Sequence, residues 1–578
     1  MSTDAGREPL VGVVGEGPAI EAARAALADV AVRLEPRDAT NVADCRLVVA
    51  AGLADGGSLV ETNRAAVAAG IPLVVVEVGG LGGTPVEGPG IVGVLGPTGP
   101  CYTCLRERAA GTAEETVSEP TATPSGVRYA GATAGYLAIQ HLGEADLTGR
   151  VVVLPEDRHQ LLAVPHCPTC APDRDWSLDL TETSELDTAA AAAAAEGAVD
   201  ERLGPVEVVG ERESYPAPYY LARLAPTDRI SDGQPRREAA GVAAGWDAAY
   251  MKALGEAMER YSAGVYRTAD LIEAPADALP NPVPPDEFVL PRDVSVPDSE
   301  TPVRWVPGVD LESQTAVSLP ADRTLFPPPG DGLGNPITTG LGLGTSVTDA
   351  VLAGLTEVLE RDATMLAWYS TYDPMGLAVE DDEYAALARR ANSESLSVTA
   401  TLLTQDIDIP VVAVAVHRDS WPRFAAGSAA GLDAEAAARN ALSEALQNWM
   451  ELRALGRADA ADAGPAVARY ADDPDQVREL IEPAPTLPAG DVGPRDPPTG
   501  RTAVRTLVDR VSAAGVAAYA ARLTARDVAA LGFEAVRVLV PGAQPLFVDE
   551  PVFGDRARTV PEELGYEPRV DRASHPFP

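Results

Sequence analysis

Lysine is almost absent from this chain of 578 residues. The 45 basic residues include one lysine, Lys252, and all the others are arginine. A phosphate-binding P-loop requires Gly-Lys-Ser/Thr, whereas Lys252 stands between Met251 and Ala253. The sequence therefore excludes a P-loop nucleotide site. None of the five histidines forms an HExxH pair, which excludes the zinc hydrolases built on that motif.

Long apolar runs are missing as well. No stretch of about 18 uncharged apolar residues occurs, and the opening MSTDAGREPLVGVV has no basic segment ahead of an apolar core. These absences exclude a membrane-spanning helix and a secretory signal, so we expect a cytoplasmic protein. Hydrophobic residues make up 46% of the chain, which is enough for several globular domains.

Acidic residues dominate the charge. The net charge is -41 and the pI is about 4.4. Such a surface repels nucleic acid and anionic membranes, so neither is expected as a partner. The abundance of Asp and Glu resembles that of cytosolic halophilic proteins, which hold water and cations against concentrated salt. A GC-rich genome would explain arginine in place of lysine, but not the acidity.

Four of the five cysteines form two Cys-x-x-Cys pairs, and Cys45 is expected in the core. The spacing is that of zinc knuckles, which present four thiolates tetrahedrally. Disulfides are unfavourable in a reducing cytosol. We therefore predict a closed, structural Zn²⁺ site, with free thiols or redox chemistry as the alternatives. Its ligands are Cys101, Cys104, Cys167 and Cys170.

The first part of the chain alternates apolar runs with helical segments. The runs at 10–17, 45–52 and 71–80 predict strands of a parallel α/β sheet. Gly12, Gly15 and Gly17 form only part of a dinucleotide fingerprint, because Ile20 stands where a third glycine is needed. We therefore expect a structural turn here instead of a nucleotide site, as in a degenerate Rossmann-like domain.

This α/β segment ends in two knuckles, the second inside HCPTC. It resembles the ubiquitin-activating-like (ThiF/E1-like) zinc domain of thiazole/oxazole peptide cyclodehydratases. The resemblance implies that residues 1–172 dock a precursor peptide and adenylate nothing. Residues 173–203 are acidic and rich in alanine, which predicts a partly helical linker. A further α/β domain is expected over residues 204–578.

Three predicted helices of this second domain each carry a polar pair at positions i and i+3. One lies at 245–266, one follows the glycine-rich TTGLGLGTS at 338–346, and one lies at 432–455. Thr345 or Thr348 is expected to cap the second. The spacing places each pair on one helical face, and carboxylates bordered by core favour a divalent cation. One pair alone is more simply an exposed acidic face, but three predict a shared site. The pairs are Glu256/Glu259, Glu357/Glu360 and Glu444/Gln447.

These motifs, ExxER, ExxER and ExxQ, closely match those of the YcaO family, whose ATP and Mg²⁺ lie between such helices. The resemblance implies that Glu256, Glu259, Glu357 and Glu360 hold Mg²⁺ and phosphate. It implies nucleotide contacts from a further set: Lys252, Arg260, Thr339, Arg361, Glu444 and Gln447. Lys252 stands where the family commonly has serine, and Thr339 where many members have asparagine.

The chain ends in RASHPFP. This resembles, in shortened form, the proline-rich C-terminus that enters the active site of YcaO cyclodehydratases. The resemblance implies catalytic roles for His575, Pro576 and Pro578, with His575 as a proton acceptor near neutral pH. A frayed terminus is the alternative.

The resemblance to SagD-like maturases implies bacteriocin-type chemistry: ATP-dependent backbone cyclodehydration of Cys, Ser or Thr to azolines, with ATP, Mg²⁺ and structural Zn²⁺. Thioamidation, an accessory role in ribosomal-protein modification, and a non-catalytic peptide-binding scaffold are the alternatives. The expected partner is a precursor peptide. No winged-helix module is visible, so a leader-binding partner is a further expectation, together with an azoline dehydrogenase. A homodimer remains open.

Overall fold

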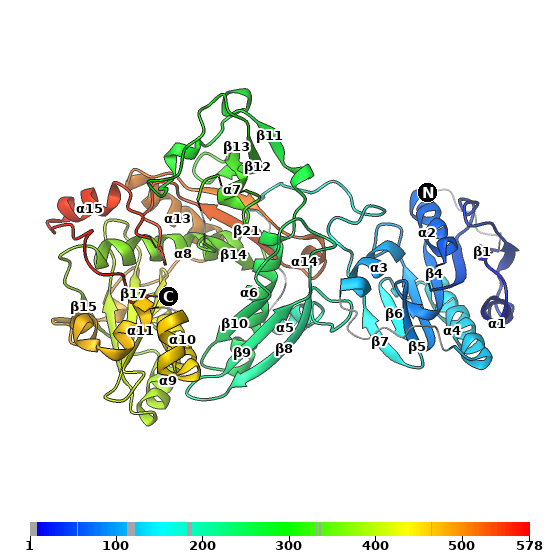
Figure 1. Cartoon of the computed structure of the whole chain (residues 1–578), viewed down its shortest axis with the longest axis horizontal. Helices are drawn as coiled ribbons and strands as arrows, with labels where there is room; N and C mark the ends of the chain where they lie inside the picture. Colours follow the sequence, from blue (N-terminus) through cyan, green and yellow to red (C-terminus); the bar gives the residue numbers. More distant parts are fainter. Residues whose placement is uncertain are drawn as a thin grey trace.

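The computed structural model describes residues 8–54, 56–111, 122–181, 186, 188–330, 332–334, 337–463, 465–548 and 550–577. It is a mixed α/β structure, as predicted, and contains four sheets. Figure 1 shows the N-terminal sheet to one side and the other three sheets grouped together. None of the described helices is long and apolar enough to cross a bilayer.

The N-terminal sheet has seven strands in the order β2-β1-β3-β4-β5-β6-β7. Its strands are β1 (Leu10–Val14), β2 (Arg33–Pro36), β3 (Leu47–Leu53), β4 (Leu73–Leu81), β5 (Thr84–Leu95), β6 (Arg150–Val153) and β7 (Asp157–Gln160). Helices α1 (Pro18–Leu27) and α4 (Pro124–Leu142) cover one face, and α2 (Gly57–Ala69) and α3 (Tyr102–Gly111) cover the other.

The three apolar runs predicted as parallel strands, β1, β3 and β4, do pair in parallel, and three further strands of the sheet are antiparallel. Strands β1 to β4 pair in parallel, whereas β5 pairs antiparallel with β4 and with β6, and β6 pairs antiparallel with β7. Only Gly82 and Gly83 separate β4 from β5, and both have positive φ. A two-residue turn can join antiparallel strands only. Apolar runs show that strands are buried, but not in which sense they pair.

Three further sheets make up the second part of the chain. The three-stranded sheet contains β8 (Val206–Glu213), β9 (Tyr219–Leu224) and β10 (Glu238–Val242). The six-stranded sheet contains β11 (Ile272–Ala274), β12 (Val303–Asp310), β13 (Ala316–Pro320), β14 (Leu341–Gly344), β20 (Tyr519–Arg522) and β21 (Glu534–Leu539). The five-stranded sheet contains β15 (Met375–Ala378), β16 (Ser397–Leu402), β17 (Val411–His417), β18 (Phe424–Ala430) and β19 (Thr486–Pro488).

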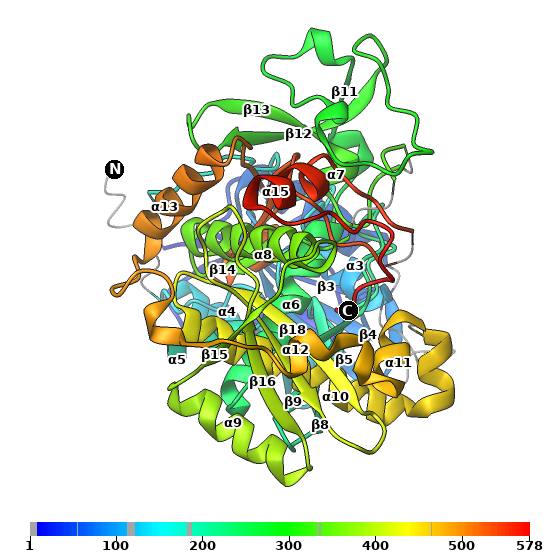
Figure 2. The ribbon, with the colours of Figure 1, turned by 90° about the vertical axis from the view of Figure 1, so that its left-hand side faces the viewer.

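Three long helices connect these sheets. Helix α6 (Trp246–Gly264) contacts β9, β10, β14 and β21, and α8 (Val347–Trp368) contacts β14, β21, β17 and β18. Helix α10 (Ala434–Ala463, with non-helical geometry at Gly456) covers β17 and β18. Figure 2 shows α8 crossing the molecule between β12 and β13 on one side and β16 to β18 on the other. Helix α8 therefore packs against two sheets.

Shorter helices complete the fold. They are α5 (Thr188–Glu196), α7 (Ala321–Thr324), α9 (Asp382–Ser393), α11 (Pro465–Asp472), α12 (Arg478–Ile481), α13 (Gly500–Ala513), α14 (Arg526–Ala530) and α15 (Arg556–Leu564).

The segment 173–203 is anchored by buried residues at several of its described positions. Leu180 is buried and its carbonyl oxygen accepts a hydrogen bond from Thr348 on α8 (3.1 Å). Ala191 and Ala195 on α5 belong to the same apolar cluster as α6. The alanine run is helical, as expected, because alanine has the highest helix propensity. These buried contacts show that the described part of this segment packs against the rest of the chain and is not a free tether.

Candidate functional site

Helix α8 begins at a side-chain cap and lies very close to β14. Ser346 is its N-cap, since its hydroxyl accepts a hydrogen bond from the N–H of Asp349 (3.1 Å). The predicted caps Thr345 and Thr348 are therefore wrong, because Ser346 has the extended backbone that a cap requires. A Cβ on Gly354 would lie 2.5 Å from the carbonyl oxygen of Gly340. The small residues of the glycine-rich stretch allow the helix to rest directly on the strand.

The α8 pair, Glu357 and Glu360, points toward polar partners. Glu357 accepts a hydrogen bond from the N–H of Gly340 (2.9 Å), and Glu360 accepts one from the hydroxyl of Ser428 on β18 (2.6 Å). Burial raises the pKa of both carboxyls, for Glu360 to about 8, and the charge of Glu444 adds to each shift. Because burial disfavours the ionised form of Glu360, a bound cation would stabilise that form.

The α6 pair lies opposite. Glu256 accepts from the N–H of Ala240 (2.7 Å) and forms an ion pair with Arg260. Burial, followed by the charges of Glu357 and Glu256, raises the pKa of Glu259 to about 8. The perturbation by Glu357 shows that α6 and α8 bring their carboxylates into mutual electrostatic range. Lys252 lies exposed on α6, one turn before Glu256.

The third pair is on α10. Glu444 accepts a hydrogen bond from the N–H of Ser428 (3.3 Å), the residue whose hydroxyl binds Glu360. Ser428 therefore links α8 and α10 at one point of β18. Gln447 donates to Glu451 (3.1 Å), which also accepts from the hydroxyl of Tyr219 (2.8 Å). Ser428 thus joins α8 with α10, and the effect of Glu357 on the pKa of Glu259 joins α8 with α6.

Arginines balance these carboxylates. Arg361 lies 3.4 Å from Glu360 and 4.0 Å from Glu357. Burial works against its charge, but Glu360, Glu444 and Glu357 together raise its pKa. The arginine of each ExxER motif therefore neutralises its own glutamates, which explains why the motif contains a cation four residues after its first glutamate.

The sequence did not identify Arg537. It lies on β21, is 4% exposed, and donates to the carbonyl oxygen of Ile337 (2.8 Å). Its Nε and Nη1 atoms have no hydrogen-bond partner among the residues that the structure describes. Burial and the charge of Arg323 lower its pKa to about 10, while Glu357 and Glu259 act in the other direction. The sequence feature that could have identified Arg537 is the presence of a charged residue inside the otherwise apolar stretch EAVRVLV.

A small cavity of about 70 Å³ lies beside these arginines. Arg323, Arg361 and Arg537 line it together with Thr339 and apolar side chains. The Nε atom of Arg323 also lacks a hydrogen-bond partner. Buried guanidinium N–H groups without acceptors are costly unless an anion binds them. The side of the site that these arginines form is therefore suited to binding phosphate oxygens, and Thr339 also lines the cavity.

The glutamates fit a divalent cation in type and charge. Carboxylates whose pKa is raised by burial and by one another are stabilised in their ionised form by Mg²⁺. Among the described residues, however, only the four cysteines form a group of three or more potential ligands whose donor atoms lie within 4.8 Å of one another. The glutamates do not form such a group in this structure. In this structure Arg260, Arg361 and backbone N–H groups compensate the glutamates.

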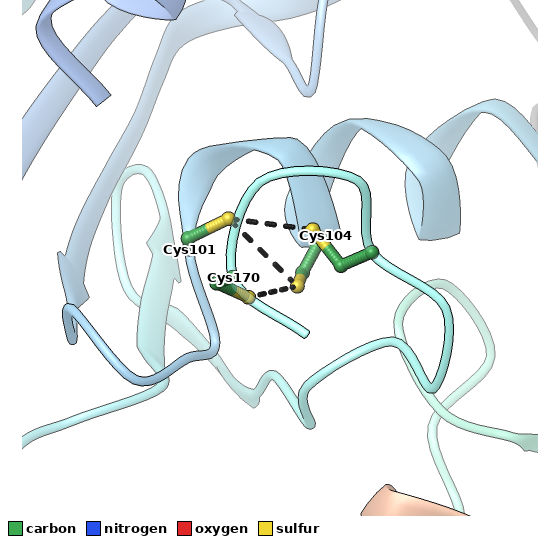
Figure 3. A group of neighbouring side chains, drawn as sticks. Cys101, Cys104 and Cys170 are labelled. Atoms are coloured by element: carbon green, nitrogen blue, oxygen red, sulfur yellow. Dashed lines mark hydrogen bonds between the residues drawn. The ribbon is translucent and has the colours of Figure 1, made fainter. Parts of the chain in front are cut away.

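The four predicted zinc ligands form a compact cluster, part of which Figure 3 shows. Tetrahedral zinc with Zn–S bonds of about 2.3 Å requires sulfurs roughly 3.8 Å apart. The Sγ atoms of Cys101 and Cys104 lie 3.9 Å apart, those of Cys101 and Cys167 3.6 Å, and those of Cys104 and Cys170 3.5 Å. The cluster therefore fits zinc. Hydrogen bonds from the other cysteines, Cys104 first, lower the pKa of Cys101, which favours the thiolate.

The C-terminal residues return to α8. Trp368 donates to the carbonyl oxygen of Ala573 (2.9 Å), and Phe577 is buried in the same apolar cluster as α8. His575 and Pro576 are buried, and the Nε2 atom of His575 lies 2.6 Å from the carbonyl oxygen of Phe547. Burial lowers the pKa of His575, as does the charge of Arg361. Figure 1 marks the C-terminus near α8, α10 and α11, and Pro578 lies outside the described residues.

Comparison with known proteins agrees with this geometry. Residues 240–544, just over half of the chain, match the family model described as "YcaO cyclodehydratase", ATP- and Mg²⁺-binding. These limits enclose the three polar pairs and Arg537.

Two solved structures share the fold. A heterocyclase in complex with substrate and cofactor aligns with 99% of this chain and 84% of its own, at 20% identity and a TM-score of 0.72. The heterocyclase TruD aligns with 97% of this chain and 82% of its own, at 20% identity and a TM-score of 0.64. The N-terminal sheet is therefore part of the shared architecture.

A curated relative, an uncharacterized protein of Methanothermobacter thermautotrophicus, is 30% identical over 225 residues. The match covers 36% of this chain and spans little more than half, 56%, of that relative. On the extent of the family match and of the shared fold, this chain belongs to the YcaO cyclodehydratase family.

Proposed function

We propose that the chain is an ATP-dependent cyclodehydratase that converts Cys, Ser or Thr of a ribosomally made peptide to azolines. The observation that carries the proposal is the meeting of α6, α8 and α10. Their carboxylates perturb one another, and Arg537 adds a buried guanidinium with unpaired N–H groups. Alternating clusters of carboxylate and guanidinium are what a polyphosphate and its cation require.

The chemistry follows from the poor leaving ability of an amide oxygen. The side chain of the modified residue attacks the preceding carbonyl carbon and loses its proton. The resulting oxygen takes the γ-phosphoryl group of ATP, and loss of phosphate together with the amide proton leaves the azoline and ADP. Arg361, Arg537 and Arg323 stabilise the charge on the transferred group. Mg²⁺ held by Glu256, Glu259, Glu357 and Glu360 would offset the remaining negative charge.

His575 is the proposed proton acceptor. A carbonyl oxygen only accepts hydrogen bonds, so the contact with Phe547 places the hydrogen on Nε2 and leaves a lone pair on Nδ1. Among the described residues this buried Nδ1 atom has no hydrogen-bond partner within ordinary distance, although the backbone of Phe577 is close enough to act on the pKa of the ring. The lowered pKa keeps the imidazole neutral at physiological pH, which is the form a general base needs. Pro576 and Pro578 would hold the tail in place.

The N-terminal sheet is the proposed peptide-docking domain. We assign residues 1–172 to it, residues 173–203 to a connecting segment, and residues 204–578 to the catalytic domain. The cysteine quartet, with Zn²⁺ bound, would stabilise its two knuckle loops. Four thiolate ligands complete a tetrahedral shell, so the role assigned to this site is structural.

The test combines the protein with ATP, Mg²⁺ and a short Cys/Ser/Thr-rich peptide encoded beside its gene. The expected products are phosphate and a peptide lighter by one water per modified residue. Glu360→Gln and Glu357→Gln should abolish both, whereas Glu563→Gln, exposed on α15, should not. Full activity in both active-site variants would refute the assignment.

The same assay separates the alternatives. Exchange of an amide oxygen for sulfur, in the presence of sulfide, would indicate thioamidation. Modification of a ribosomal protein but of no peptide would indicate the accessory role. Failure of the protein to bind ATP with Mg²⁺ in calorimetry would favour the peptide-binding scaffold.

A further inference from the structure

A buried polar triad lies where the N-terminal sheet meets α6. It consists of Arg108 on α3, Tyr261 on α6 and Asp527 on α14, which are 4%, 0% and 0% exposed. Arg108 donates to the hydroxyl of Tyr261 (2.9 Å) and forms an ion pair with Asp527. Tyr261 in turn donates to Asp527 Oδ2 (2.7 Å). Each pair within the triad is thus directly joined.

The triad connects the cysteine quartet with the glutamate site. Arg108 follows Cys104 by one turn of α3, and Tyr261 follows Glu259 by two residues on α6. On α14, Arg526 donates to the sulfur of Cys170 (3.5 Å), immediately before Asp527. Both knuckles therefore contact the same junction, one through α3 and one through α14. In Figure 1, α3 and α14 lie between the N-terminal sheet and α6.

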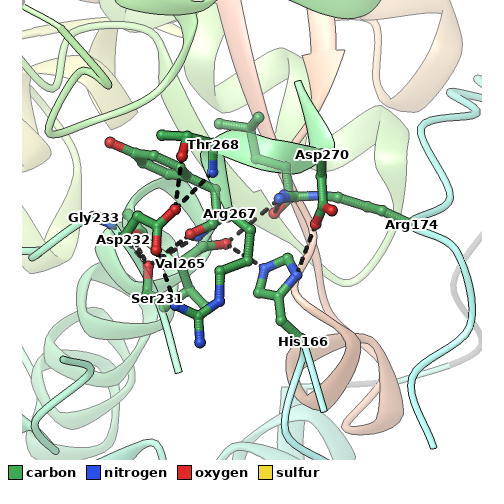
Figure 4. A network of polar contacts seen from close by, with 12 residues as sticks. His166, Arg174, Ser231, Asp232, Gly233, Val265, Arg267, Thr268 and Asp270 are labelled. Atoms are coloured by element: carbon green, nitrogen blue, oxygen red, sulfur yellow. Dashed lines mark hydrogen bonds and ion pairs between the residues drawn. The ribbon is translucent and has the colours of Figure 1, made fainter. Parts of the chain in front are cut away.

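A second set of contacts holds the end of the same helix. Val265 is the C-cap of α6, and its carbonyl oxygen lies 3.4 Å from both Arg174 Nη1 and His166 Nε2. His166 Nδ1 lies 3.2 Å from Asp270. Figure 4 shows His166 and Arg174 converging on Val265 and Asp270. Both residues flank the second knuckle, so the quartet loops contact α6 at two successive turns.

Apolar packing follows the same path. The four cysteines share one hydrophobic cluster with Ala253, Leu254, Ala257 and Met258 of α6. These residues lie on the helical face that faces away from the nucleotide side, where Glu256 and Glu259 project. A displacement of the quartet would therefore move the helix that carries two of the proposed ligands.

A buried ionic triad specifies geometry more strongly than it stabilises a fold. Apolar side chains of similar volume often give equal or greater stability, because burying charges is costly. Apolar contacts, however, allow two packed segments to shift relative to each other. A guanidinium, a hydroxyl and a carboxylate form all their mutual hydrogen bonds in only one arrangement. Burial raises the pKa of Tyr261 well above its ordinary value, so the hydroxyl remains a donor to Asp527.

We propose that Arg108 is a positioning residue for the nucleotide site. Through Tyr261 and Asp527 it fixes α6 relative to the cysteine quartet, and so holds Glu256 and Glu259 where the nucleotide and its cation bind. The quartet thereby sets nucleotide affinity from outside the site. This inference rests on the proposed ATP-dependent function.

The test measures binding of the non-hydrolysable analogue AMPPNP with excess Mg²⁺ by calorimetry, together with zinc content and Tm. Arg108→Met should weaken binding by about tenfold, within the usual range for coupled sites. Arg108→Lys keeps the charge and should restore most of the affinity. Arg106→Met is the matched control, since it makes the same substitution two residues earlier on α3 and should bind as wild type does.

Tyr261→Phe removes one hydroxyl, keeps the ion pair, and provides a milder variant should Arg108→Met fail to fold. It should weaken binding about fivefold, at the lower end of the range for coupled sites. A folded, zinc-loaded Arg108→Met protein with lowered Tm but wild-type affinity would show a merely structural triad and overturn the inference. Absence of AMPPNP binding by the wild-type protein would instead overturn the proposed function, and the inference with it.

Discussion

The glutamate site should make the stability of the protein depend on pH in an unusual direction. Glu360 has a pKa of about 8 in the folded protein, against an ordinary value of 4.5. Between these values the folded state binds more protons than the unfolded state, so the free energy of unfolding falls as the pH rises. The contribution of Glu360 is fully present below about pH 4.5 and is lost as the pH passes through about 8.

The size of this effect follows from the shift. Each pKa unit corresponds to about 1.4 kcal/mol, so Glu360 alone accounts for at most about 5 kcal/mol between the two limits. Its coupling to Glu444 and Arg361 will reduce this, and we expect about 2 to 3 kcal/mol to be measurable. Glu259, whose pKa is also about 8, should contribute in the same direction.

The assay is urea unfolding at about pH 5 and about pH 9, a window that contains most of the shift. The other carboxylates of this acidic chain also respond to pH, so the informative quantity is the difference between variants. Glu360→Gln is isosteric, can still accept from Ser428, and should lose less stability than wild type over this window. Glu563→Gln, exposed on α15, should behave as wild type does.

Mg²⁺ provides the second part of the experiment. A cation binds the ionised carboxylates, so it should stabilise wild type more at the higher pH than at the lower one. Glu360→Gln should reduce this pH-dependent gain. Equal pH slopes in wild type and Glu360→Gln would refute the assignment of a raised pKa to Glu360. An equal gain from Mg²⁺ at both pH values would refute the cation site.

Three further variants test other parts of the site. Arg537→Met should lower kcat/KM for ATP by about a hundredfold, because a buried hydrogen-bond donor to phosphate is lost. Arg537→Lys should retain part of the rate. Activity of the Met variant equal to that of wild type would contradict a role of Arg537 in phosphate binding. Gly354→Val should destabilise the protein by about 1 to 3 kcal/mol in urea unfolding, since its side chain meets the Gly340 carbonyl, and Ala353→Val on the exposed side is the control. Cys101→Ser should release zinc, measured by elemental analysis, and lower Tm; retention of one zinc per chain would contradict a four-cysteine site.

Much of this protein could be predicted from its sequence because the features concerned depend on the spacing of residues that lie close together in the chain. Residues three or four apart on a helix share a face whatever surrounds them, so ExxER, ExxER and ExxQ could be assigned to helices, and the family followed from them. Likewise, the two cysteines of a Cys-x-x-Cys pair lie within a single turn of the chain, so they can bind the same metal ion. The mixed α/β fold and the YcaO membership predicted on this basis are confirmed by the fold comparison and the family match.

Features that join distant segments could not be read in this way. Ser428 links Glu360 with Glu444, and Arg537 comes from a strand nearly 200 residues beyond Glu357. The antiparallel half of the first sheet depended on a two-glycine turn that an alternation of apolar runs does not reveal. The cap at Ser346 depended on its extended backbone and on the hydrogen bond that its hydroxyl accepts from Asp349 N–H.

The sequence by itself therefore determined the family, the candidate carboxylates and the candidate zinc ligands, because these are encoded in short, regular spacings. Tertiary structure alone brought Arg537 near Glu259 and Glu357, and joined the cysteine quartet to α6 through Arg108, Tyr261 and Asp527. The physical reason is that the burial of a charged group and the identity of its hydrogen-bond partners depend on segments hundreds of residues apart. The packing of the whole chain determines which of these segments come together.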